Sequence, residues 1–342
     1  MTLSQYWQDV QAAAQQKGQP ILSLAPMEAV TNAVFRGVVE QAGAPDLFYT
    51  EFTHAKSITH PKAKFAAQGR LYVPDSEPKF PVIQLWGNDG KDYETASVAV
   101  REMGYEAINI NMGCPAPTVI KNHGGSDMIR HPDDAAAVIA GAKKAGLPVS
   151  VKTRLGYSDL DEFREWIPFL LRQDVQTLMV HVRTRKEMSK VPAHYEVIDE
   201  LIQMRDAIAP DTLIGINGDV ENRTEAVQLA LDHPGLDGVM IGRGIFHNPF
   251  CFETEPKSHT IGELVELLRL QLANFDKFSK RYDNPRFAYL KRFFKIYIKD
   301  FAGSNEARTE LMDTTSTDDV RRVLDENPHI QAAVQSGELM KS

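Results

Sequence analysis

The chain lacks the features that mark secreted, disulfide-bonded and membrane-spanning proteins. Its 342 residues contain only two cysteines, Cys114 and Cys251, which are too few for a disulfide framework. No run approaches the roughly 20 apolar residues of a membrane helix. Residues 1–20 are polar and have no apolar core of the kind found in secretion signals. We therefore expect a cytoplasmic protein, monomeric and without a membrane partner.

Several motifs of common protein classes are also missing. No Gly-x-Gly-x-x-Gly follows the first expected strand, which argues against an open, doubly wound dinucleotide-binding sheet. The chain has no Gly-x-Ser-x-Gly elbow. It also has no Cys/His cluster with the spacing of a zinc site, so we expect no metal. The formal net charge of −8 argues against a general nucleic-acid binder.

What the chain does contain is a repeated strand–helix pattern. Short apolar segments are typical of buried parallel strands, and helical patterns separate them. Eight such units within about 250 residues predict an α/β fold of the (β/α)8 TIM barrel class. The expected strands are residues 21–25, 47–51, 81–85, 107–111, 148–153, 178–182, 213–217 and 238–241, and the expected helices are 32–42, 93–103, 133–145, 160–172, 195–208 and 223–231.

The pattern changes after residue 252. Residues 253–259 are polar and contain Pro256, as in a linker, and helical periodicity follows at 261–282, 285–302 and 317–325. We predict a catalytic barrel domain over residues 1–252 and a small all-helical domain over 259–342. Basic and acidic residues balance from His259 onward, so the negative charge belongs to the barrel. A basic strip lies beside the single acid Asp283, and its members are Lys277, Lys280, Arg281, Arg286, Lys291, Arg292, Lys295 and Lys299.

Polar residues gather where the expected strands end, and in a barrel these ends meet at the mouth where active sites are built. Cys114 lies in a Gly-Cys-Pro turn after the fourth strand, and is either catalytic or a small buried hydrophobe. Lys152 in the fifth strand is costly to bury alone, so it either pairs with Asp219 or holds an electron-rich ring or a phosphate. His181 could be an ordinary core histidine. Cys114, Lys152 and His181 occupy corresponding positions in successive strand–helix units, and this favours a functional site.

The last two strands are followed by a pattern suited to phosphate. Residues 217–219 read Asn-Gly-Asp and residues 242–244 read Gly-Arg-Gly. Their glycines allow backbone N–H groups to come close to a ligand, and Arg243 offers a bidentate guanidinium. Loops after the seventh and eighth strands form the usual phosphate site of this fold. We therefore expect a phosphorylated ligand or cofactor at Gly242 and Arg243.

Taken in order, these segments resemble the tRNA-dihydrouridine synthases, FMN-dependent enzymes that reduce uridine in tRNA. The resemblance lies in LAPMEAVT at residues 24–31, NMGCP at 111–115, VKTRLG at 151–156, HVRTR at 181–185, NGD at 217–219 and MIGRG at 240–244. Two departures stand out. Ala29 replaces the family's usual glycine, and residues 122–127 match only the glycines of the loop after the cysteine.

The resemblance implies Cys114 as general acid, FMN as cofactor, NADPH as electron donor and tRNA as partner. Hydride would add at uracil C6, and the thiol, protonated near neutral pH, would protonate C5. We expect reduction in the D-loop, Asn111 and Arg183 at the substrate, and the face of Lys291, Lys295 and Lys299 on the tRNA backbone. The implied FMN contacts are Pro26, Met27, Glu28, Gln84, Lys152, His181, Asn217, Gly218, Asp219, Gly242 and Arg243.

Two alternatives stay open at this point. A small-molecule FMN barrel of the dihydroorotate dehydrogenase type would share the barrel and a Cys or Ser acid, but it would not need a basic helical domain. An RNA-binding module without catalysis would need neither Cys114 nor a buried Lys152. A flavin spectrum would exclude the second alternative, and dependence on RNA would separate the first from a tRNA-modifying enzyme.

Overall fold

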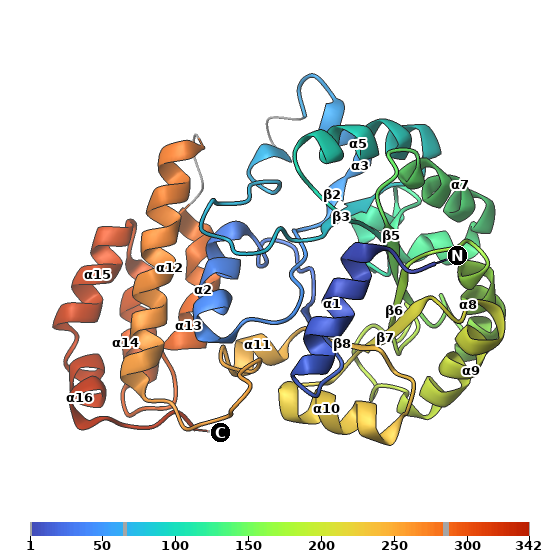
Figure 1. Ribbon diagram of the computed structural model, residues 1–342. Helices are drawn as coiled ribbons and strands as arrows, with labels where there is room; N and C mark the ends of the chain where they lie inside the picture. Colours follow the sequence, from blue (N-terminus) through green and yellow to red (C-terminus); the bar gives the residue numbers. More distant parts are fainter. Residues whose placement is uncertain (1, 64–66, 283–286, 342) are drawn as a thin grey trace. The chain divides into compact units, whose positions relative to one another are not determined.

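The computed structural model describes residues 2–63, 67–282 and 287–341. Its centre is a sheet of eight strands in the order β1-β8-β7-β6-β5-β4-β3-β2, and every neighbouring pair is parallel (Figure 1). The strands are β1 (Ile21–Leu24), β2 (Thr53–His54), β3 (Ile83–Trp86), β4 (Ile108–Met112), β5 (Val149–Arg154), β6 (Thr177–His181), β7 (Leu213–Asn217) and β8 (Gly238–Ile241). The chain therefore has the predicted (β/α)8 fold, followed by a helical region.

The second strand differs most from its expected form. Over residues 47–51 the backbone makes only single parallel bridges, from Leu47 to Ser23 and from Tyr49 to Val82. These bridges join β1 to β3 and close the ring of strands. The ladder is interrupted because the Thr50 hydroxyl accepts the Gln84 backbone N–H at 3.1 Å, in place of a backbone carbonyl. Regular pairing resumes only at β2.

Helices surround the strands, as Figure 1 shows for α5, α7, α8, α9 and α10. Their starts are fixed locally: Asp89 caps α5, Asn222 caps α10, and Asp159 with Glu162 forms a capping box before α8. These helices are α5 (Gly90–Glu102), α7 (Pro132–Lys143), α8 (Phe163–Leu171), α9 (Ile198–Ile208) and α10 (Arg223–Asp232), and the shorter pieces are α3 (Ala55–Thr59), α6 (Pro117–Ile120) and the 3-10 turns η1 (Gly125–Arg130), η2 (Leu160–Glu162) and η3 (Tyr195–Val197).

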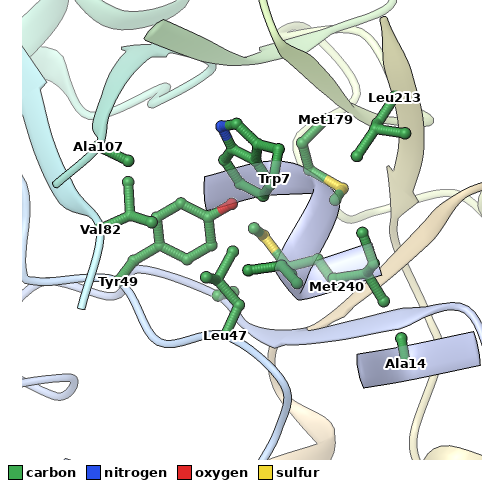
Figure 2. Packing of buried hydrophobic residues seen from close by; sticks show 12 residues of the cluster. Trp7, Ala14, Leu47, Tyr49, Val82, Ala107, Met179, Leu213 and Met240 are labelled. Carbon is green, nitrogen blue, oxygen red and sulfur yellow. The ribbon is translucent and has the colours of Figure 1, made fainter. Parts of the chain in front are cut away.

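The helix α1 (Gln5–Gln16) covers the end of the barrel where the strands begin. Trp7 is 2% exposed and packs among side chains at or near the starts of the strands, including Leu47, Val82 and Leu213 (Figure 2). The backbone N–H of Ser4 donates to the Gln176 side chain at 2.6 Å and ties the start of α1 to the barrel. This end is thus filled by apolar packing, which leaves the opposite mouth for chemistry.

The chain divides into two compact units, one of Met1–Asn32 with Pro45–Arg243 and one of Ala33–Ala44 with Gly244–Ser342. The helix α2 therefore belongs with the C-terminal helices, and the Asn274 side chain donates to the Val34 carbonyl at 3.3 Å. The functional domain boundary expected between residues 252 and 259 stays a prediction. The second unit contains α2 (Ala33–Gly43), α11 (Gly244–His247), α12 (Ile261–Arg281), η4 (Phe287–Phe293), α13 (Phe294–Tyr297), α14 (Ser304–Asp313), α15 (Thr317–Glu326) and α16 (Pro328–Ser336).

The expectation of one continuous α-helix over residues 285–302 was wrong. Its described part is the 3-10 segment η4 followed by the single turn α13, and Ile298 leaves the helical region at φ −104° and ψ 84°. Within η4 the buried side chains Leu290 and Phe293 lie three residues apart, which matches the 3-10 period. Arg286 of the basic strip and the neighbouring Asp283 lie outside the described residues. Across the part of the chain that is described, no helix combines the length and the apolar character needed to cross a membrane.

Candidate active site at the barrel mouth

A chain of side-chain hydrogen bonds crosses the barrel interior and ends at Cys114. Asn109 donates to the Ser150 hydroxyl at 2.9 Å and accepts from the Gln84 amide at 2.7 Å. Asn111 donates to Gln84 Oε1 at 2.9 Å. The Asn111 Oδ1 then accepts the backbone N–H of Cys114 at 2.9 Å. Because these groups are buried and mutually bonded, the orientation of Asn111 and of the following turn is fixed.

The turn that carries Cys114 is held from three sides. Arg154 Nε donates to the Gly113 carbonyl at 2.8 Å, and both the backbone N–H and the hydroxyl of Ser126 donate to the Cys114 carbonyl at 3.0 Å. Gly125 has φ 59°, and a Cβ there would lie 2.6 Å from the Cys114 carbonyl oxygen, so only glycine fits. The turn presents a partly buried thiol, and burial raises the pKa of Cys114. The thiol is therefore protonated at neutral pH.

Lys152 and His181, on β5 and β6, each have a side-chain nitrogen that no group in the described part of the chain satisfies. The strand register sets Lys152 beside Asn111, and His181 beside Asn217. Among the described residues, the Lys152 ammonium has no hydrogen-bond or ion-pair partner, and burial and then Arg154 lower the pKa of Lys152 to about 7. The His181 Nδ1 is buried without a partner in the described part of the chain. Burial and then the cations led by Arg154 hold the pKa of His181 well below its ordinary value, so this imidazole is neutral.

Asp219 does not pair with Lys152, although that pairing was one interpretation of the sequence. It is instead ion-paired with Arg183, and it accepts from Arg243 Nη2 at 3.0 Å. Arg183 is buried, and its Nη1 has no hydrogen-bond partner within the described chain. Asn217 is fixed by donating to the Met240 carbonyl at 2.7 Å. The Asp219 carboxylate, after β7, therefore joins the guanidiniums of Arg183, after β6, and Arg243, after β8.

Gly242 lies at this edge of the mouth, where an added Cβ would make only ordinary van der Waals contacts. A Cβ built on it would have its nearest contact, the Ala25 Cβ, at 3.7 Å, with the Asn217 amide nitrogen at 3.9 Å. Arg243 is 58% exposed, so its guanidinium can reach a ligand while it remains beside Asp219. Gly218, at φ 137°, adopts a backbone conformation that glycine favours. The pattern of glycines and guanidiniums that suggested a phosphate site in the sequence is thus brought together in space.

The loop after β1 has a different environment from the β7 and β8 loops. Pro26 and Met27 are partly buried, whereas Glu28 is exposed and forms a two-pronged ion pair with Arg70, at 2.5 and 2.7 Å. Ala29 has φ 56°, and its backbone N–H donates to Glu51 at 2.5 Å. A positive φ is the conformation in which glycine is easiest to accommodate, which explains why a glycine is usual at this position in the sequences that the chain resembles.

Comparison with known protein families shows to which family the chain belongs. The model of the family described as "Dihydrouridine synthase (Dus)" matches residues 23–335. The chain belongs to the dihydrouridine synthase family. It is 50% identical over 308 residues to "Probable tRNA-dihydrouridine synthase 2" of Bacillus subtilis, covering 90% of this chain and 94% of that protein. It is also 48% identical to "Probable tRNA-dihydrouridine synthase" of Staphylococcus epidermidis, covering 90% and 93%.

A solved structure of a variant of NCR from Zymomonas mobilis also matches, with 18% identity, a TM-score of 0.42 and coverage of 67% of this chain and 83% of that one. A similarity this low carries no argument about activity.

The chain also has a cavity of about 380 Å³ near the turn that carries Cys114. His54 and Trp86 meet edge to face in its wall, with ring centroids 4.4 Å apart. Glu28 and Arg70 supply charged groups, and Ala116 joins the cavity to the turn of Cys114. Of these residues, only Glu28 was among the predicted contacts. Trp86 is the last residue of β3, and its place at the end of a strand is visible in the sequence, although no role was predicted for it.

The three lysines predicted to hold the tRNA backbone lie on η4, on α13 and just beyond it. Since this segment is not one α-helix, they do not form the straight row that the sequence suggested. Lys291 donates to the Met312 carbonyl at 2.5 Å, and Lys295 is exposed. Lys299 is only 18% exposed, forms an ion pair with Asp300 at 3.6 Å and donates to the His247 carbonyl. Lys291 and Lys295 are therefore the better placed of the three.

Proposed function

We propose that this protein is an FMN-dependent oxidoreductase that reduces the C5–C6 double bond of uridine in tRNA, with Cys114 as the general acid. The observation that carries the proposal is the group of unsatisfied polar atoms at the barrel mouth. Lys152 has no partner, and His181 Nδ1 and Arg183 Nη1 are buried without one among the described residues. Such atoms are costly in a folded protein unless a ligand pairs with them.

These residues fit FMN. The Lys152 ammonium would hold the polar edge of the flavin ring, while Pro26, Met27 and Glu28 would border it. Gln84 is fully buried and bonded to Asn109 and Asn111, so it would support the flavin site through Asn111. Gly242 and Arg243, with the loop of Asn217, Gly218 and Asp219, would hold the FMN phosphate. Arg243→Ala should weaken FMN retention by about 1.5–3 kcal/mol, roughly ten- to a hundredfold. When bound, FMN supplies the hydride that the reduction of uracil requires.

The residues of the chain supply orientation and the proton. Hydride addition at C6 of the uracil ring leaves negative charge on C5 and the conjugated carbonyl. The raised pKa of the Cys114 thiol keeps its proton in place at neutral pH, so the proton is available for transfer to C5. The turn that carries the thiol is held rigidly by Asn111, Arg154 and Ser126. Asn111 and Arg183 are proposed to position the substrate base, which must leave the tRNA fold to reach the mouth.

The choice of tRNA as substrate rests on the names of the relatives. The alignments with this chain span more than nine-tenths of the length of each of these two relatives. NADPH as electron donor, the D-loop as the site of reduction, and a cytoplasmic monomer remain our predictions. The barrel bears the negative charge of the chain, so a local basic surface must attract RNA. Lys291 and Lys295 are exposed enough to provide part of that surface.

The decisive experiment separates reduction of the flavin from reduction of the tRNA. Cys114→Ala should retain FMN and allow NADPH to bleach it, because that half-reaction needs no proton donor to uracil. Reoxidation of the reduced flavin by unmodified tRNA should slow by about 10²–10⁴-fold. The matched control is Cys251→Ala, since Cys251 is buried in the other unit and should leave both half-reactions unchanged. Dihydrouridine formation by Cys114→Ala at the wild-type rate would exclude the thiol as the acid.

A second experiment tests the tRNA surface. Replacing Lys291 and Lys295 together with Glu should weaken tRNA binding. The slope of log affinity against log salt should fall by about 0.7–0.9 for each phosphate that the protein no longer neutralises. FMN content and NADPH oxidation should stay unchanged. Lys91→Glu with Lys144→Glu, both exposed on barrel helices, is the control of equal charge. If both double variants shift tRNA binding equally, the effect is one of net charge and the assignment fails.

A further inference from the structure

The loop after the catalytic turn brings together three groups that sequence reasoning did not connect. His123, Asp127 and His131 are four residues apart along the 3-10 turn η1 and its flanks, and their ligand atoms all lie within 4.8 Å of one another. The pattern His-x3-Asp-x3-His lies outside the zinc-site spacings considered from the sequence. An i, i+4, i+8 search for His and acidic residues would have found it.

We propose that His123, Asp127 and His131 form a binding site for a divalent transition-metal ion. Two imidazoles and one carboxylate are a donor set that suits zinc, cobalt or nickel, whereas calcium and magnesium prefer oxygen ligands. The ion would keep one or more water ligands, because the protein offers three donors.

The distances within the cluster fit such a site closely. Metal–ligand bonds of about 2.0–2.1 Å in a tetrahedral site put neighbouring ligand atoms about 3.3–3.4 Å apart. His123 Nδ1 is 3.2 Å, and His131 Nε2 is 3.5 Å, from the same oxygen, Asp127 Oδ2. Two edges of the ligand triangle are therefore already formed. The third edge closes by small rotations of the imidazoles, which are free to move because His123 is 62% and His131 is 39% exposed.

The carboxylate is also prepared for a cation. Asp127 is buried, and Arg130 binds its other oxygen, Oδ1, through Nε at 3.1 Å and through Nη2. Arg130 fixes the orientation in which Oδ2 faces the imidazoles, but its positive charge also repels a metal ion. Removing that charge should strengthen metal binding.

The position of the cluster suggests what the ion would do. Ser126 lies within the same turn and donates twice to the Cys114 carbonyl. An ion that links His123 to His131 would clamp both ends of η1 and so stabilise the segment that holds the catalytic turn. The role is one of positioning, since none of the three side chains contacts the Cys114 thiol in the described structure.

The test uses Zn²⁺ alone as the probe, with FMN-loaded protein and competition against a chromophoric chelator. A Cys114→Ala background removes zinc binding by that thiol. We expect one zinc ion per chain, and His123→Ala or His131→Ala should weaken binding by at least about tenfold, as removal even of outer partners of a metal commonly does. Arg130→Gln should tighten it. His233→Ala is the matched control, because His233 forms an imidazole–carboxylate contact with Asp199 at 2.7 Å without a second histidine among the described residues.

A spectroscopic readout makes the result independent of affinity. Co²⁺ bound by two imidazoles and a carboxylate should give visible absorption bands that disappear in His123→Ala and His131→Ala. The proposal is overturned if zinc does not bind, or if His123→Ala and His131→Ala bind zinc as strongly as the parent protein. It is also overturned if the His233→Ala control weakens binding as much as they do. None of these outcomes depends on tRNA reduction, so they leave the proposed activity to its own test.

Discussion

Replacing Lys152 with Met should make the flavin-free protein more stable and the flavin complex weaker. The ammonium lies in the barrel mouth beside Asn111 and has no partner in the described structure. Burial, and next the Arg154 guanidinium, lower the pKa of Lys152 from 10.5 to about 7. The folded protein therefore carries this charge at a cost that a methionine of similar length would remove.

The magnitude follows from the pKa. A difference between 10.5 and about 7, at about 1.4 kcal/mol for each tenfold change in proton affinity, corresponds to at most about 5 kcal/mol. Since the side chain is only partly buried, solvent screening reduces our expectation to about 2 kcal/mol. Between these two pH values the unfolded chain keeps a proton that the folded protein has released. Stability of the wild-type protein therefore rises with pH across that window, and the full cost is present below it.

The assay is urea unfolding of flavin-free wild type and Lys152→Met at pH 6, 8 and 10. The variant should be more stable by about 2 kcal/mol at pH 6, and the difference should shrink toward pH 10. Lys144→Met, at an exposed position, should show no such pH dependence. FMN affinity should fall by about ten- to a hundredfold, because a charge-assisted hydrogen bond is removed. A destabilised Lys152→Met at pH 6, or a stability difference that does not change with pH, would refute this reasoning.

Two further predictions concern the framework around the site. Ala29→Gly should stabilise the protein by about 0.5–1 kcal/mol in thermal unfolding, because Ala29 has φ 56°. Ala29→Val should destabilise it, and the opposite order of the two variants would contradict the account of this loop. Trp7→Ala should cost about 3–5 kcal/mol in urea unfolding, because Trp7 fills the closed end of the barrel. Trp7→Phe should cost clearly less, since the buried indole N–H has no hydrogen-bond partner among the described residues, and equal destabilisation would count against packing as the cause.

The sequence predicted the barrel well because strand and helix positions depend on local periodicity. The expected strands 213–217 and 238–241 coincide with β7 and β8, and the others shift by a few residues, except for the second. There, a hydroxyl from Thr50 replaces a backbone acceptor, and no periodicity of apolar residues reports such an exchange. Likewise, the spacing of Leu290 and Phe293 reads almost equally well as an α-helix or as the 3-10 segment that forms.

The candidate site shows the same division. The sequence by itself determined that Cys114, Lys152, His181 and Arg243 lie at one mouth, because parallel strands of a barrel all end on the same side. Only the tertiary structure decided which polar groups are satisfied: Asp219 binds Arg183 and Arg243 and leaves Lys152 alone among the described residues. It also decided that α2 belongs with the C-terminal helices. Pairings of this kind depend on distances between residues far apart in the chain, and local pattern carries no information about them.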